Sequence, residues 1–160
     1  MRELDSAATA VDRVVTALQA GGVDADVRRF EQPVPTAAAA AGVLGCEVGA
    51  IANSLVFEAD GAPLLVLASG AHRVDTGTVA ALIGARRVRR ASAEFVLAAT
   101  GQEVGGVAPV GHPAPLRTVV DVDLAAHPVL WAGGGDHYTM FAATFDELVR
   151  MTAGEVAAVV

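Results

Sequence analysis

The feature that most restricts the fold is the dipeptide Asp60-Gly61, which stands between two apolar runs. Asp-Gly supplies the positive φ angles that a tight hairpin turn requires. Residues 51–57 and 63–68, on either side of it, have the apolar character of strands. We therefore expect an antiparallel β-hairpin near the middle of the chain, and a β-sheet to which the other elements are added.

Helix starts are marked at five other places. Ser, Thr and Asp side chains accept hydrogen bonds from the first N–H groups of a helix, and glycine commonly follows the last turn. Five such residues precede runs with helical spacing or high alanine content, and one opens a capping box with Glu147. The expected N-caps are Ser6, Thr36, Asp75, Ser92 and Thr144.

Single strands are expected between these helices. A hairpin plus single strands separated by helices favours a mixed sheet over a doubly wound one. About five helices and seven strands in 160 residues, roughly one domain's worth, predict a single α+β domain over residues 1–160. The expected strands cover residues 24–30, 86–90, 116–122, 129–132 and 137–141.

The composition limits the cellular compartments and the classes of partner that we expect for this protein. The formal net charge is −7 and all 11 basic residues are arginine, which argues against broad electrostatic attraction to DNA or RNA. No window of 18 residues stays apolar, and the N-terminus lacks the apolar segment of a signal peptide. The lone Cys46 permits no internal disulfide and no cysteine-rich zinc site. We expect a soluble cytoplasmic protein without a membrane partner.

Two glycine-rich segments could bring backbone close to a ligand. Residues 100–111 lack the Gly-Lys-Ser/Thr step of a phosphate-binding loop, and residues 132–137 lack the G-x-G-x-x-G spacing of a dinucleotide turn. A nucleotide cofactor is therefore not expected. Because glycine has no Cβ, bare N–H groups in these segments could instead face a cavity. Residues 102–115 predict a long irregular loop, and long ordered loops are usually functional.

The four histidines show no metal-binding spacing. With neither an H-E-x-x-H motif nor an i, i+4 pair, we expect no metal site. Asp136 and His137 are adjacent, and on a strand they would point to opposite faces and could not form a catalytic dyad. His112 lies in the glycine-proline loop, where it is either a solvent-exposed side chain or part of a pocket lining.

Four arginines within residues 86–90 form the densest positive charge in the chain. A solvated strand face is the simpler explanation of such a run, and contact with an RNA backbone is the alternative. In that case Arg87 and Arg89, on the strand face opposite Val88, would bind the phosphates.

Taken in order, these elements resemble the YbaK/EbsC family, freestanding relatives of the editing domain inserted in bacterial prolyl-tRNA synthetases. The resemblance covers about residues 8–155 and is most specific in IANSLVFEADG (51–61), LASGAHRVD (67–75), ATGQEVGGVAPVGH (99–112) and LWAGGG (130–135). It implies a mixed, barrel-like sheet with flanking helices and a pocket for the aminoacyl end of tRNA. It also implies hydrolysis of mischarged aminoacyl-tRNA in trans, without a metal or organic cofactor, and allows an aminoacyl-tRNA synthetase as a partner.

The resemblance also implies roles for individual residues. The carbonyl of the ester would lie near Gly101 and the 105–111 loop, whose N–H donors would stabilise the developing oxyanion. Gly106 would mark the place where the backbone approaches the ester, and Asn53 would be a polar contact. Water or a substrate hydroxyl would attack the carbonyl. The substrate-binding positions are Phe30, Ser54, Gly105, Pro109, Gly111, His112 and Gly134.

One position departs from the family pattern in a way that bears on catalysis. The family normally has lysine before Ser/Thr-Leu-Val, where this chain has Asn53, and the chain contains no lysine at all. Phe30 stands where some relatives have tyrosine. Asn53 can still donate two hydrogen bonds, but without a charge. Two hypotheses follow: an attenuated trans-acting aminoacyl-tRNA deacylase, or a non-catalytic module that binds aminoacyl-tRNA, an amino acid or a synthetase.

Overall fold

The hairpin predicted around Asp60-Gly61 forms the centre of the fold. In the computed structural model, which describes residues 9–160, β2 (Ile51–Ala59) pairs antiparallel with β3 (Ala62–Ser69). Asp60 and Gly61 have φ angles of 51° and 87°, the positive values that the turn requires. The prediction of the hairpin is therefore confirmed.

The hairpin tip is tied to the segment that precedes β4. The carboxylate of Asp60 accepts the backbone N–H groups of Arg86 and Arg87, each at 2.9 Å. These two hydrogen bonds lower the pKa of the Asp60 carboxyl. Asp60 thus supplies both the turn geometry and the docking of the next strand.

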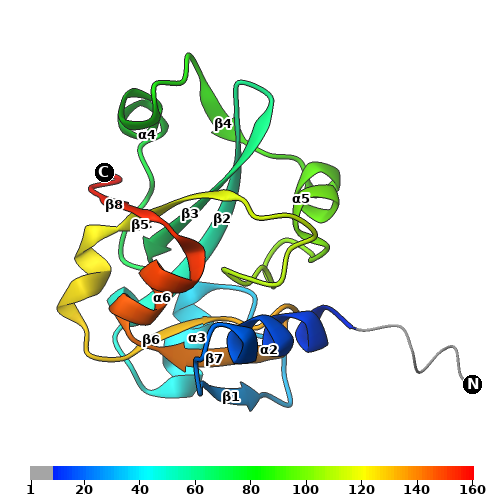
Figure 1. The fold of residues 1–160 in the computed structure, drawn as a ribbon. Coiled ribbons are helices and arrows are strands. Elements are labelled where there is room, and N and C mark those ends of the chain that lie inside the picture. Colours follow the sequence, from blue (N-terminus) through cyan, green and yellow to red (C-terminus); the bar gives the residue numbers. More distant parts are fainter. Residues whose placement is uncertain (1–8) are drawn as a thin grey trace, which may run out of the picture.

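Eight strands form one mixed sheet in the described part of the chain. Their order is β1-β7-β6-β2-β3-β5-β8, with β4 paired to β2 off this path. β2 pairs parallel with β6, and β5 pairs parallel with both β3 and β8. In Figure 1 the β2–β3 hairpin leads from the β1-β6-β7 end of the molecule to the end that carries α4, β4 and α5. The other strands are β1 (Asp26–Arg29), β4 (Val88–Arg90), β5 (Arg117–Asp121), β6 (Leu130–Gly133), β7 (Thr139–Ala143) and β8 (Glu155–Ala157).

Four of the five α-helices begin at their predicted N-caps. The side chains of Thr36, Asp75, Ser92 and Thr144 each accept a backbone N–H from the first turn. The first described helix begins after Thr9, and the predicted cap Ser6 lies outside the described residues. Among residues 9–160, no helix is long and apolar enough to cross a membrane. The helices are α2 (Ala10–Ala20), α3 (Ala37–Leu44), α4 (Thr76–Ile83), α5 (Ala93–Thr100) and α6 (Phe145–Thr152), with a 3-10 turn η1 (Val48–Ala50).

Burial on both faces explains the continuous apolar run of β3. Leu65 and Leu67 belong to a core cluster that includes side chains of α2 and α6. Leu64 and Val66 belong to a second cluster with α4 and β4. All four side chains are fully buried, so apolar residues are needed at every position rather than at alternate ones. A third cluster around Trp131 joins α3 to β6 and β7.

One strand ends earlier than expected, and one strand was missed. The predicted strand 116–122 stops at Asp121, whose carboxylate accepts the N–H of Asp123 at 3.0 Å and opens a second 3-10 turn, η2 (Val122–Ala126). β8 has three residues and pairs with β5 at the edge of the sheet. A strand of that length carries too few positions for a recognisable alternation.

The turn before β7 corrects the placement of Asp136 and His137. β7 begins at Thr139 rather than at residue 137, and the Asp136 carboxylate accepts the N–H of Tyr138 at 2.8 Å. The two residues therefore lie in a turn and not, as expected, on opposite faces of a strand. The ring of His137 instead lies with Nε2 2.8 Å from the carbonyl oxygen of Val104.

Candidate active site

A cavity of about 770 Å³ lies beside β2. Its walls come from residues 34–37, 51–57 and 72–76, from the loop after α5, and from residues of β4, β6 and β7. This volume is within the range of about 300–1,000 Å³ that small-molecule sites occupy. Four of the stretches that carry the family resemblance therefore meet at one cavity.

Asn53 and Ser54, two residues that the resemblance assigns to the site, line this cavity from β2. The carboxamide of Asn53 has no hydrogen-bond partner among the described residues. The hydroxyl of Ser54 is buried and also lacks a partner within that part of the chain. Asn53 is therefore free to donate to a bound molecule, whereas the Ser54 hydroxyl has no base beside it that could activate it as a nucleophile.

Some N–H groups of the glycine-rich loop donate to backbone carbonyls of the described chain, and others do not. That of Gly101 donates to a carbonyl of the last turn of α5 at 2.8 Å, and that of Gly106 donates to a carbonyl three residues earlier at 2.9 Å. Gly105 and Val107 line the cavity, and within residues 9–160 neither N–H has an acceptor. The geometry thus favours Gly105 and Val107 as donors to a substrate oxygen. Sequence reasoning missed Val107, because an N–H carries no residue-type signal.

The backbone of Gly106 lies close to the backbone of Asp136, in the turn before β7. A Cβ at this position would lie 2.7 Å from the carbonyl carbon of Asp136, closer than real Cβ atoms come to backbone. The Gly106 carbonyl also accepts the N–H of Gly135 at 3.0 Å. A side chain at this position would therefore meet the turn before β7 first.

Five of the predicted substrate-binding residues lie outside this cavity, and so do Gly101 and Gly106. Pro109, Gly111 and His112 line a smaller cavity of about 240 Å³ beside α2. Gly134 lies in the β6–β7 turn, where its N–H donates to a β7 carbonyl at 2.7 Å. Phe30 packs against the third core cluster. Their roles in binding remain predictions from the resemblance.

His112 is a partly buried lining residue rather than a solvent-exposed one. Its Nε2 lies 2.8 Å from the carbonyl oxygen of Ala108, which requires the proton on that nitrogen. Burial lowers the pKa of His112 below its usual value, and the hydrogen bond to Ala108 opposes this only in part.

We expect His112 to destabilise the protein in mild acid. Because its pKa is lower in the folded state, the unfolded chain binds a proton first as the pH falls below about 6.5. The free energy of unfolding should therefore decrease from neutral pH toward the lowered pKa. Urea unfolding between about pH 5 and 8 should show a smaller decrease for His112→Gln, whose amide can still donate to Ala108. Equal pH dependence in both proteins would contradict this.

The cations that reach the cavity differ from the predicted pair. Arg87 precedes the short strand β4, and Arg89 lies 3.5 Å from Glu58. Arg73 and Arg90 line the cavity with exposed side chains, and neither has an ion-pair partner within the described residues. The arginine run did signal this region, but the residue that faces the cavity is Arg90, which sequence alone did not single out.

A comparison with known protein families identifies the family of this chain. The model of the aminoacyl-tRNA editing domain matches residues 31–151. The chain belongs to this aminoacyl-tRNA editing domain family. The resemblance found in the sequence is therefore confirmed, and all of the cavity-lining stretches lie within the matched editing domain.

Individual relatives of this editing domain agree with that assignment. The uncharacterized protein YwhH of Bacillus subtilis is 30% identical over 132 residues, covering 82% of this chain and 83% of that protein. A crystal structure described as "a putative trans-editing enzyme for prolyl tRNA synthetase" is 39% identical, with a TM-score of 0.88 and coverage of 96% and 98% of the two chains. A proline–tRNA ligase of Bacillus pumilus is 34% identical over 101 residues, which are 61% of this chain and only 18% of the ligase. The mixed α+β fold is thus that of the editing domain.

Proposed function

We propose that this protein is a trans-acting aminoacyl-tRNA deacylase, which hydrolyses the ester between an amino acid and the 3′ end of a mischarged tRNA in the cytoplasm. The observation that carries the proposal is the meeting, in one cavity, of the free N–H groups of Gly105 and Val107 with the free amide of Asn53. Family membership supports an aminoacyl-tRNA as the substrate.

The reaction needs stabilisation of charge more than it needs a protein nucleophile. When water attacks the ester carbon, the carbonyl oxygen of the ester becomes negative. N–H groups already oriented toward that oxygen stabilise it at no cost of reorganisation. The carbon–oxygen bond to the ribose then breaks, a proton passes to that oxygen, and hydrolysis releases the amino acid and the tRNA. Gly105 and Val107 would serve as the donors.

Asn53 sets the expected strength of this activity. A charged hydrogen bond contributes about 1.5–3 kcal/mol, against about 0.5–1.5 kcal/mol for a neutral one. With an amide where the family has an ammonium, binding alone would weaken by about 1–2 kcal/mol. We propose an attenuated enzyme for this reason. The same residue is what favours the second candidate, a non-catalytic module that binds aminoacyl-tRNA or recruits a synthetase.

Arg73 and Arg90 support the proposed substrate because they put unpaired positive charge at the cavity of a protein whose net charge is −7. A tRNA acceptor end brings phosphates to whatever cavity receives its aminoacyl group. We propose that these two guanidinium groups bind the terminal phosphates.

Replacing Arg73 and Arg90 together with alanine should weaken binding of different tRNAs to a similar extent. Phosphate contacts carry no sequence information, and two lost contacts should flatten the log–log salt dependence of binding by about 1.4–1.8. The matched control is the double variant of Arg87 and Arg89, the pair that the sequence favoured. Titrations of both double variants against salt measure the effect. A larger change in the salt dependence of the control variant would contradict this assignment and indicate that Arg87 and Arg89 bind the phosphates instead.

A further inference from the structure

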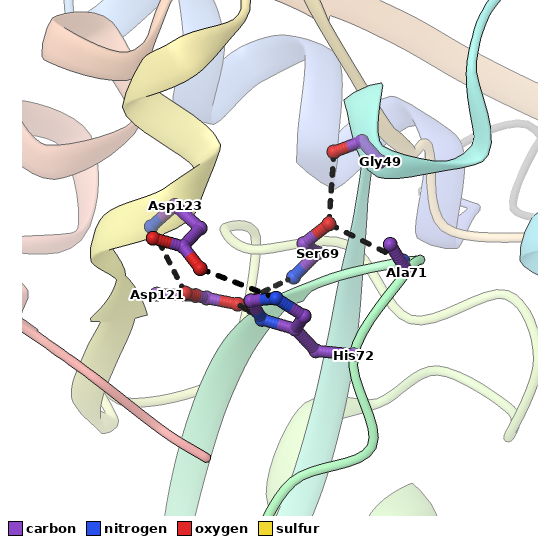
Figure 2. Close-up of polar contacts among 6 residues, drawn as sticks. All are labelled: Gly49, Ser69, Ala71, His72, Asp121 and Asp123. Carbon is purple, nitrogen blue, oxygen red and sulfur yellow. Dashed lines mark hydrogen bonds and ion pairs between the residues drawn. The ribbon is translucent and has the colours of Figure 1, made fainter.

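A polar cluster joins the segment after β3 to the end of β5 (Figure 2). The buried carboxylate of Asp121 accepts the backbone N–H groups of Ser69 and Asp123, each at 3.0 Å. The same carboxylate lies 2.7 Å from Nδ1 of His72. Because a carboxylate oxygen accepts hydrogen bonds, this contact places a ring proton on Nδ1 of His72 and leaves Nε2 as the second nitrogen of the ring.

Nε2 of His72 faces a second carboxylate. It lies 3.2 Å from an oxygen of Asp123, and the Asp123 side chain is 62% exposed. With Nδ1 protonated, the neutral ring presents a lone pair at Nε2, so two electron-pair donors would face each other. A cation between them removes the repulsion. That cation is either a second proton, which makes an imidazolium, or a metal ion reached from solvent.

The distances suit a metal ion. Imidazole nitrogens and carboxylate oxygens bind Zn²⁺ at about 2.0–2.2 Å, so two such ligands at angles of about 90–110° lie about 3.0–3.5 Å apart. The 3.2 Å separation falls in this range. In metal sites the second nitrogen of a ligating histidine commonly donates to a carboxylate, which fixes the ring and raises its basicity. Asp121 already occupies that place.

We propose that His72 and Asp123 bind a divalent transition-metal ion of the zinc, cobalt or nickel class, with Asp121 orienting the imidazole and water completing the coordination. Imidazole combined with carboxylate suits these ions. The three donor groups lie within 4.8 Å of one another. Sequence spacing could not reveal the site, because His72 and Asp121 are 49 positions apart. The inference does not depend on the proposed deacylase activity.

Titration of the purified, metal-free chain with Co²⁺, followed by its visible absorption, tests this proposal. We expect saturable binding of one ion per chain, displacement by Zn²⁺, and weaker binding at lower pH because protons compete for Nε2. Asp123→Asn, at an exposed position, and His72→Gln should each weaken binding at least tenfold. Asp121→Asn should weaken it about 10- to 100-fold through the lost orientation of the ring.

His127→Ala is the matched control. His127 is as exposed as His72, but its Nδ1 lies 3.9 Å from Glu47, too far for the two to share one ion easily. This variant should bind Co²⁺ as the parent does. Binding that survives in Asp123→Asn and is lost in His127→Ala would overturn the assignment. So would the absence of saturable binding at about 1 mM free ion, which would leave the cluster as a set of contacts among protein groups alone.

Discussion

Replacing Asn53 with lysine should raise the rate of aminoacyl-tRNA deacylation by about 10²-fold. The position is the third residue of β2 and lines the cavity, and its amide has no partner among the described residues. An ammonium group there would add a charge-assisted contact to the ester or to the terminal phosphate. A donor that acts on the developing oxyanion is worth far more in the transition state than in the bound ground state.

Single-turnover hydrolysis at saturating enzyme measures this gain separately from binding. Asn53→Gln is the control, because it lengthens the side chain and keeps it neutral, so its rate should stay near that of the parent. If the lysine variant binds substrate but hydrolyses it no faster, position 53 has no catalytic role. A gain would identify the natural protein as an attenuated enzyme.

Gly106→Ala should lower turnover by about 10²-fold and destabilise the fold by about 1–3 kcal/mol. The new Cβ would come 2.7 Å from the backbone of Asp136, so the loop and the turn before β7 must move apart. Gly105 and Val107, on either side, carry the proposed donors, and a displacement of about 1 Å in a reacting geometry is enough for a loss of this size.

Gly42→Ala provides the matched control for that variant. Gly42 lies in α3 with nothing within 4 Å of its would-be Cβ, so alanine should stabilise the protein by about 0.5–1 kcal/mol and leave turnover unchanged. Thermal melting and single-turnover rates, measured well below the melting temperature of each variant, separate the two effects. If the Gly106→Ala protein is destabilised yet fully active, the oxyanion site does not lie on this loop.

Local signals predicted most of the fold. The turn at Asp60-Gly61 and the N-caps Thr36, Asp75 and Thr144 each act through backbone groups within a few residues, so the sequence nearby is sufficient to find them. The predicted end of a strand was wrong where a side chain ended the strand earlier, as Asp121 does for β5. The edge strand β8 was missed because its pairing with β5 is made at a distance in the chain.

The candidate site was predicted less completely than the fold. Asn53, Ser54 and Gly105, which the resemblance assigns to the site, line one cavity. The resemblance could not tell which loop N–H groups were already bonded, which is why Val107 was missed. Nor could it tell which arginines face inward, since that depends on how the short strand β4 is set against β2.

Incubating the purified wild-type chain with a panel of aminoacyl-tRNAs and measuring the amino acid released tests the proposed deacylase activity. We expect release from at least one member above the rate with heat-denatured protein, and faster release from the same member by Asn53→Lys. Tight binding of aminoacyl-tRNA without release from any member, by either protein, would contradict the deacylase and establish a binding module in its place.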